Sequence, residues 1–193
     1  MDRKYPRLNL TRSNSGRTGD PMKLGDGVEQ AIHSVLVMSG LSETGVLSAA
    51  ALAEFHGVSP SYLLKHLQAM AGAGLLESVP GPKGGYRLAK AADKITLLDI
   101  VLAVEGPEPA FRCAEIRQRG PNPVAQHFFK MPCAVNAAML KAERAYRAEL
   151  RKIRVADLAG DSGGALGKAI ATRTCAFFDL HERNRSTTTT SKE

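Results

Sequence analysis

The sequence predicts a mainly α-helical protein with one small β-hairpin. Apolar residues recur at three- and four-residue steps over residues 22–38 and 59–73, as in amphipathic helices. Residues 80–85, rich in Gly and Pro, then separate two short strand-like runs. A further long amphipathic pattern begins at residue 133. Two helices joined by a tight turn and followed by a hairpin form a winged helix-turn-helix, which we expect over residues 22–105 with a long helix after it.

The first helix is expected over residues 22–38. Its apolar stripe consists of Leu24, Val28, Ala31, Ile32, Val35 and Leu36. Glu29 and His33 are four residues apart, so they share a face of the helix away from this stripe. Taken alone, they are most simply a surface pair. Residues 1–21 are basic with little apolar periodicity, so we expect a disordered tail, or alternatively a basic arm that contacts phosphates.

The helix-turn-helix is expected between Ser48 and residue 73. Ser48 is a suitable N-cap for the second helix, and Gly57 a suitable end. Ser59 is expected to cap the third helix, residues 59–73, with Pro60 at its first helical position. Hydroxyl, phenol, cation and amide groups on its outer face suit a DNA major groove, although a solvated helix face would look similar. The candidate DNA-binding residues of this helix are Ser59, Ser61, Tyr62, Lys65, His66 and Gln68.

The wing is expected from two strands, residues 75–79 and 86–88, joined by the turn at residues 80–85. The glycines of the turn, Gly84 among them, would let the backbone approach a phosphate closely, and Lys83 and Arg87 would supply positive charge. A plain hairpin loop is the alternative. The net charge of +7 suits a polyanionic partner without proving one.

The second half of the chain alternates loop and helix. Thr96 is expected to cap a helix over residues 97–104, which Gly106 and the prolines after it would end. Residues 106–132 form a long polar loop that contains Cys113, and loops of this length are usually functional or disordered. A helix over residues 133–154 carries an apolar seam typical of a dimer interface. A helical extension, residues 155–182, and a disordered tail, residues 183–193, complete the prediction.

The cysteine count and the absence of some motifs limit the function. Three cysteines and no recognisable signal peptide favour free, metal-bound or redox-active thiols in the cytoplasm. Cys113 and Cys133 have 19 residues between them, a weak metal signal by spacing alone, and Cys175 is expected to be a packed apolar residue. No run of apolar residues is long enough to span a membrane. No catalytic triad or phosphate-binding loop is recognisable, so we expect neither an enzyme nor a small-molecule substrate.

Several short motifs occur in order, and together they resemble the Rrf2 family of bacterial transcription regulators over about residues 22–155. They are Met22-Lys-Leu24, Val58-Ser-Pro-Ser-Tyr-Leu63, Ala73-Gly-Leu75, Gly81-Pro-Lys-Gly-Gly-Tyr86 and the segment from Ile95 to Gly106. This resemblance implies a homodimer, most often a repressor, that binds a pseudo-palindromic operator in double-stranded DNA. Many members hold iron–sulphur clusters with three closely spaced cysteines in the loop. Only Cys113 and Cys133 are available here, which argues against an all-cysteine 4Fe–4S site.

The segments from Met22 to His33 and from Ala110 to Pro121 are similar to the RsrR-like subgroup of that family. That resemblance implies a 2Fe–2S cluster bound by Cys113 and Cys133 of one protomer with Glu29 and His33 of the other. His127, in the loop, could replace a ligand. Two alternatives are a cluster-free regulator with thiol switches and a module of the same fold that binds a metabolic enzyme rather than DNA.

Overall fold

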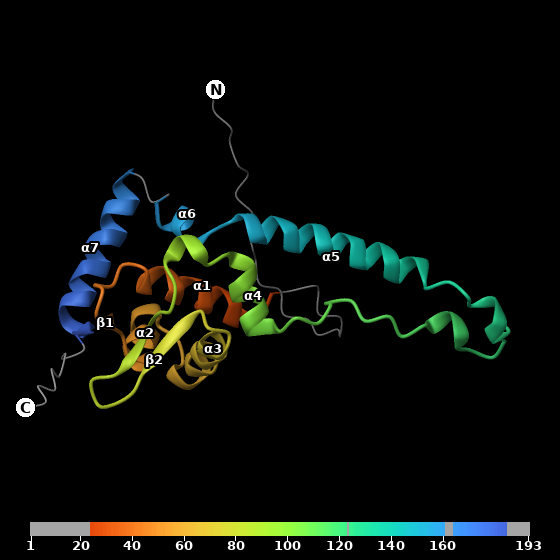
Figure 1. The fold of residues 1–193 in the computed structure, drawn as a ribbon, viewed down its shortest axis with the longest axis horizontal. Coiled ribbons are helices and arrows are strands. Elements are labelled where there is room, and N and C mark those ends of the chain that lie inside the picture. Colours follow the sequence, from red (N-terminus) through yellow and green to blue (C-terminus); the bar gives the residue numbers. More distant parts are fainter. Residues whose placement is uncertain (1–23, 123, 161–163, 185–193) are drawn as a thin grey trace, which may run out of the picture.

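Helices account for most of this computed structural model, which describes residues 24–122, 124–160 and 164–184. Residues 24–105, 153–160 and 164–184 form a body, and residues 106–122 and 124–152 project from it as an arm (Figure 1). The main elements of the body are α1 (Asp26–Met38), α2 (Ala49–His56), α3 (Pro60–Gly72), β2 (Leu76–Val79), β3 (Gly85–Leu88) and α4 (Leu97–Glu105). The mainly α-helical fold with a small β wing is therefore confirmed.

Helix α1 starts later than the sequence pattern suggests. It begins at Asp26 after an N-cap at Gly25, so Leu24 lies outside the helix and is exposed. The rest of the predicted stripe faces inward, with Val28, Ala31 and Val35 buried. This burial fixes the rotation of α1 and leaves the opposite face to solvent.

The two helices of the helix-turn-helix have the expected ends in all but one detail. The Ser48 hydroxyl accepts a hydrogen bond from the Ala51 N–H at 3.1 Å, and Gly57 ends α2 with φ 65°, a conformation that suits glycine. Ser59 stands at the N-cap of α3, but its hydroxyl lies 3.1 Å from that of Ser61 and does not cap the helix. The predicted side-chain cap at Ser59 is therefore wrong.

The wing is an antiparallel pair of β2 and β3, in which Leu76 lies opposite Leu88 and Glu77 opposite Arg87. The glycines of its turn are required by packing within the protein. A Cβ atom on Gly84 would collide with the Val79 carbonyl oxygen, and one on Gly85 with that of Leu47. An isolated bridge between Leu47 and Tyr86 joins the wing to the rest of the body.

A capping box starts α4. The Thr96 hydroxyl accepts from the Asp99 N–H at 3.2 Å, and the Asp99 carboxylate accepts from the Thr96 N–H at 2.8 Å. This confirms the predicted helix start. Side chains from all the helices α1 to α4 then meet in one core, which includes Val35, Leu52, Leu67 and Ile100 at 0% exposure.

The C-terminal part folds back on the body as α6 (Val155–Gly160), α7 (Gly164–His181) and β4 (Arg183–Asn184). Strand β4 pairs antiparallel with β1 (Gly45–Val46), and neither strand was predicted. The predicted disorder of residues 183–193 is thus wrong for Arg183 and Asn184, while residues 185–193 and the tail at 1–21 lie outside the described residues. Cys175 on α7 is exposed, which corrects its predicted burial.

The remaining long helix, α5 (Ala134–Lys152), forms one side of the arm, and the loop that precedes it forms the other (Figure 1). Cys133 stands at the N-cap of α5. None of the described helices is both long enough and apolar enough to cross a membrane.

Candidate functional site

Helix α3 presents a polar face to solvent. Ser59, Ser61, Tyr62, Lys65 and Gln68 are all exposed, as predicted, and Tyr62 is 43% exposed. These groups include hydroxyls, a cation and an amide, which can donate to phosphates and pair with base edges. The face lies on the second helix of the helix-turn-helix, the element that such folds place in a major groove.

His66 is the exception on this helix. It is only 6% exposed, so its predicted outward orientation is wrong. The His66 ring lies directly against Gly27 of α1, and a Cβ atom on that residue would collide with the ring. The ring also packs edge-on against Tyr62, with ring centroids 4.6 Å apart. Burial, helped by the charge of Lys65, lowers the pKa of His66. His66 therefore joins α3 to α1.

The wing presents fewer free cations than the sequence suggested. The Arg87 guanidinium is paired with the Glu77 carboxylate at 2.8 Å and also donates to the Glu43 carbonyl at 3.3 Å. Gly84 is buried, and its N–H already donates to the Gly81 carbonyl at 2.9 Å, so its amide is not available to a phosphate. Lys83 is exposed at the tip of the wing, as expected.

The fold brings Cys113 close to Cys133, which stands at the N-cap of α5. The backbone N–H of Asn136 lowers the pKa of Cys133 most, and the N–H of Val135, a hydrogen bond with Cys113 and the charge of Arg117 act in the same direction. A thiol at a helix N-terminus beside a cation favours the thiolate, which is the form that binds metals. His127 is also in the arm but is exposed and lies against Phe128.

Glu29 and His33 are both exposed on α1 and line an open pocket of about 370 Å³ with Val28 and Ile32. They share a face, as predicted. The ring of His33 lies 6.1 Å from that of His56, at the end of α2. Burial lowers the pKa of His56 to about 4, with contributions from His33 and Arg173.

These two pairs are not brought together within one protomer. Helix α1 lies in the body, whereas the N-terminal end of α5 lies at the far end of the arm (Figure 1). Within the described residues, no group of three or more His, Cys, Asp or Glu side chains could hold a metal ion. A site with all four predicted ligands would therefore need a second chain.

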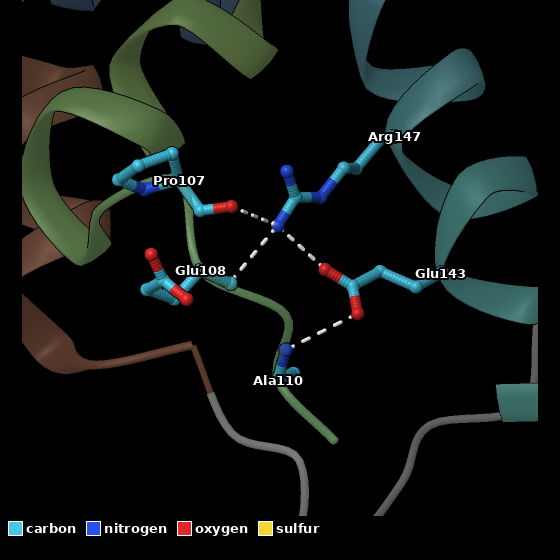
Figure 2. Close-up of polar contacts among 5 residues, drawn as sticks. All are labelled: Pro107, Glu108, Ala110, Glu143 and Arg147. Carbon is cyan, nitrogen blue, oxygen red and sulfur yellow. Dashed lines mark hydrogen bonds and ion pairs between the residues drawn. The ribbon is translucent and has the colours of Figure 1, made fainter. Parts of the chain in front are cut away.

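A polar clamp fastens the loop of the arm to α5. Figure 2 shows Arg147 donating to the carbonyl oxygens of Pro107 and Glu108, each at 3.0 Å. The Glu143 carboxylate pairs with Arg147 and accepts from the Ala110 N–H at 3.1 Å. Sequence patterns missed this clamp because its loop residues lie more than 30 positions before Glu143 and Arg147.

Helix α5 has no buried residues, and it carries exposed apolar side chains. Val135 is 60% exposed and Tyr146 is 42% exposed, and both belong to the predicted seam. An exposed apolar seam on a long helix indicates an interaction surface.

A winged helix-turn-helix with a polar outer face on its second helix defines a protein of the transcription-regulator class. The chain belongs to the Rrf2 family, described as iron-dependent transcriptional regulators, whose model matches residues 24–161. The RsrR-like subgroup is not specifically supported. YffB of Lactococcus lactis, assigned as an HTH-type transcriptional regulator, is 33% identical over 73% of this chain and 89% of its own length. IscR of Klebsiella pneumoniae is 36% identical over 48% of this chain and 56% of its own length.

Solved structures confirm the fold. IscR of T. potens superposes with a TM-score of 0.56 at 23% identity, covering 77% of this chain and 96% of that one. Oxidised CymR of Staphylococcus aureus gives a TM-score of 0.52 at 23% identity, covering 72% of this chain and 96% of that one. The relatives are transcriptional regulators, which points away from an enzyme.

Proposed function

We propose that the protein is a homodimeric repressor that binds operator DNA and senses redox state through a 2Fe–2S cluster. The observations that carry the DNA-binding part are the exposed polar face of α3 and the cation at the tip of the wing. Family membership supports the same function.

In the DNA complex, two α3 helices would enter successive major grooves about 34 Å apart. Lys65 and Lys83 would contact phosphates, while Ser61 and Gln68 would reach base edges. Ser59 and Tyr62 stand at the start of α3, where groups of a docked helix usually meet the backbone. Arg87 would act through the shape of the wing, because Glu77 already neutralises its charge.

The proposed functions are divided between the body and the arm. We assign residues 22–105 to DNA binding, residues 106–132 to cluster binding and residues 133–154 to dimerisation. The exposed seam of α5 supports this, since a second copy would cover Val135 and Tyr146.

The donor set fits a 2Fe–2S cluster. Cys113 and Cys133 would supply two thiolates from one arm, and the lowered pKa of Cys133 favours ligation. Glu29 and His33 would complete the set from α1 of the partner, where a spacing of four residues lets both reach one ion. A bound cluster would supply a redox couple, whose potential rises when His replaces Cys. The family's description as iron-dependent supports this assignment.

The signal would reach the DNA through α1. Ligation by Glu29 and His33 would tie α1 to the partner's arm, and α1 contacts α3 directly where Gly27 meets His66. A shift of α1 would therefore move α3. Small shifts are sufficient, because both half-sites of the operator must be matched at once.

DNA binding is tested by gel shift with the DNA upstream of the protein's own gene. Changing Lys65→Ala should weaken binding and reduce the slope of log K against log salt by about 0.9 for each phosphate that is no longer neutralised. Lys168→Ala removes the same charge from an exposed position on α7 and should change neither. A wild-type protein that binds no DNA in any cluster state would instead favour the protein-interaction module.

The cluster is tested on protein isolated without air. Visible absorbance should be present in the wild type and in Cys175→Ala, and absent in Cys113→Ala. A coloured Cys113→Ala protein would contradict the ligand assignment.

The closeness of Cys113 and Cys133 also favours a second candidate, a cluster-free regulator. There the two thiols would form a disulfide, giving two electrons and two protons to an oxidant. Iron and acid-labile sulphide analysis separates the two candidates, because only the cluster protein would contain both elements.

A further inference from the structure

The C-terminal extension brings a cation to the wing. Arg183 lies in β4, which pairs with β1, and its Nη1 atom donates to the carbonyl oxygens of Pro82 at 3.0 Å and Gly84 at 3.5 Å. Those two carbonyls stand on either side of Lys83 in the sequence. Arg183 is therefore bound at the tip of the wing, about 100 residues further along the chain.

The position of Arg183 is set by several contacts along the extension. Phe177 of α7 packs on Phe55 of α2 with ring centroids 4.7 Å apart, and the Arg173 guanidinium lies 4.2 Å above the same Phe55 ring. The Glu182 carboxylate then accepts from the Ser42 N–H at 3.0 Å, next to the β1–β4 pair. Because the C-terminal half of α7 packs on α2 and Glu182 is bonded to Ser42, Arg183 is held beside the wing by the fold.

The charges at the wing differ in how they are compensated. Arg87 is paired with Glu77, so its charge is largely neutralised. Among the residues that the structure describes, no carboxylate pairs with Lys83 or Arg183, and both are exposed. The tip of the wing thus carries two uncompensated cations, one from the wing itself and one from the extension.

We propose that Arg183 is a DNA-contacting residue, which binds a backbone phosphate of the operator while it holds the turn of the wing. Nη1 makes both bonds to the turn, and a guanidinium has five N–H donors in a planar fork that matches a phosphate. This inference rests on the proposed DNA binding.

The contact would raise affinity without adding base specificity, because phosphates carry no sequence information. The family match ends at residue 161, so α7 and β4 lie beyond it. The wing of this protein would therefore have a part that the family pattern does not describe.

Three variants at this position separate the effect of the charge from the effect of the hydrogen bonds that hold the turn of the wing. Arg183→Ala should weaken operator binding by about tenfold and lower the salt slope by about 0.9 per phosphate, or about 1.8 for a dimer. Arg183→Gln can still donate to the Pro82 carbonyl but has no charge, so it should show the same decrease in slope. Arg183→Lys keeps the charge and should keep most of the slope.

Lys168→Ala, which removes an exposed charge near the other end of α7, is the matched control and should leave the slope unchanged. A salt slope in Arg183→Gln equal to that of the wild type would overturn the proposal. An Arg183→Ala protein that binds weakly with an unchanged slope would also overturn it, because Arg183 would then only stabilise the turn of the wing. A wild type that binds no DNA would overturn the proposed function and the role of Arg183 together, whereas a wild type that binds DNA leaves the variants to test Arg183 alone.

Discussion

The body and the arm use their apolar residues in opposite ways. In the body, α1 to α4 share a core in which Leu47, Leu52, Leu63 and Leu67 are at 0% exposure. In the arm, none of the described residues is buried, although α5 has 19 residues and an apolar seam. A helix packed along its whole length on its own domain buries such a seam, whereas α5 contacts α4 and still leaves Val135 and Tyr146 exposed. We expect a second chain to cover these side chains.

The largest effect should come from the core of the body. Changing Leu67→Ala removes a fully buried side chain of α3 and should lower the free energy of unfolding by about 2–5 kcal/mol. Chemical denaturation, monitored by circular dichroism, measures this free energy of unfolding. Leu166→Ala makes the same change at a position that is 72% exposed, and should cost less than about 0.5 kcal/mol. Equal losses of stability in the two variants would contradict the assignment of the core.

In the arm, the corresponding substitution should act on assembly. Tyr146→Ala should weaken the dimer by about 2 kcal/mol, or about 30-fold, because buried aromatic residues dominate interfaces. Sedimentation at several protein concentrations measures this. Tyr62→Ala is the matched control, since Tyr62 is equally exposed at 43% but lies on α3. A protein that is monomeric without any substitution would refute the role given to α5.

A smaller effect is expected from His66 at the joint between α1 and α3. Burial holds its pKa below the ordinary value of 6.5. As the pH falls below 6.5, His66 takes up a proton in the unfolded chain but not in the folded chain. The free energy of unfolding therefore decreases with falling pH. The slope for one proton is at most about 1.4 kcal/mol per pH unit.

This dependence can be measured by denaturation from about pH 7.5 to about pH 5. His66→Gln should reduce the slope, and His127→Gln, at an exposed position of the arm, should not. Some slope should remain in His66→Gln, because burial also lowers the pKa of His56. An identical pH dependence in wild type and His66→Gln would show that His66 titrates normally.

Local signals explain what the sequence could predict. The Ser48 cap, the helix end at Gly57 and the Thr96 cap depend on residues within a few positions, and all three were predicted correctly. The apolar stripe of α3 likewise placed Leu67 in the core. Such features need no knowledge of the rest of the fold, because the hydrogen bonds or the periodicity lie within one segment.

The errors and omissions arose where distant segments meet. His66 has the sequence position of an outer residue, but Gly27 of α1 leaves room for its ring. The charge on Arg87 was visible in the sequence, whereas its partner Glu77 depends on the register of the hairpin. The β1–β4 pair joins residues about 140 positions apart, so a tail of polar residues gave no sign of it. The proposed ligand set depends on contacts with a second chain. Periodicity within one chain does not predict such contacts.

The smallest effect concerns the clamp between the loop of the arm and α5. The Glu143 side chain is 12% exposed and makes two contacts, with the Arg147 guanidinium and with the Ala110 N–H. Glu143→Ala removes both and should lower the protection of the Ala110 amide against hydrogen exchange by about fivefold, equivalent to about 1 kcal/mol. Glu143→Gln keeps an oxygen that can accept from this amide but has no charge, so it should retain most of the protection.

The control for the clamp is Glu149→Ala, which removes an exposed pair with Lys152 from the same helix and should leave Ala110 unchanged. Reduced protection in Glu143→Gln as well would mean that the charge on Glu143 holds the loop through Arg147. Retained protection in Glu143→Ala would mean that Arg147, through the Pro107 and Glu108 carbonyls, is sufficient. Each outcome identifies which side chain of α5 fastens the start of the loop, and hence which contact must adjust when Cys113 and α1 of the partner move relative to one another.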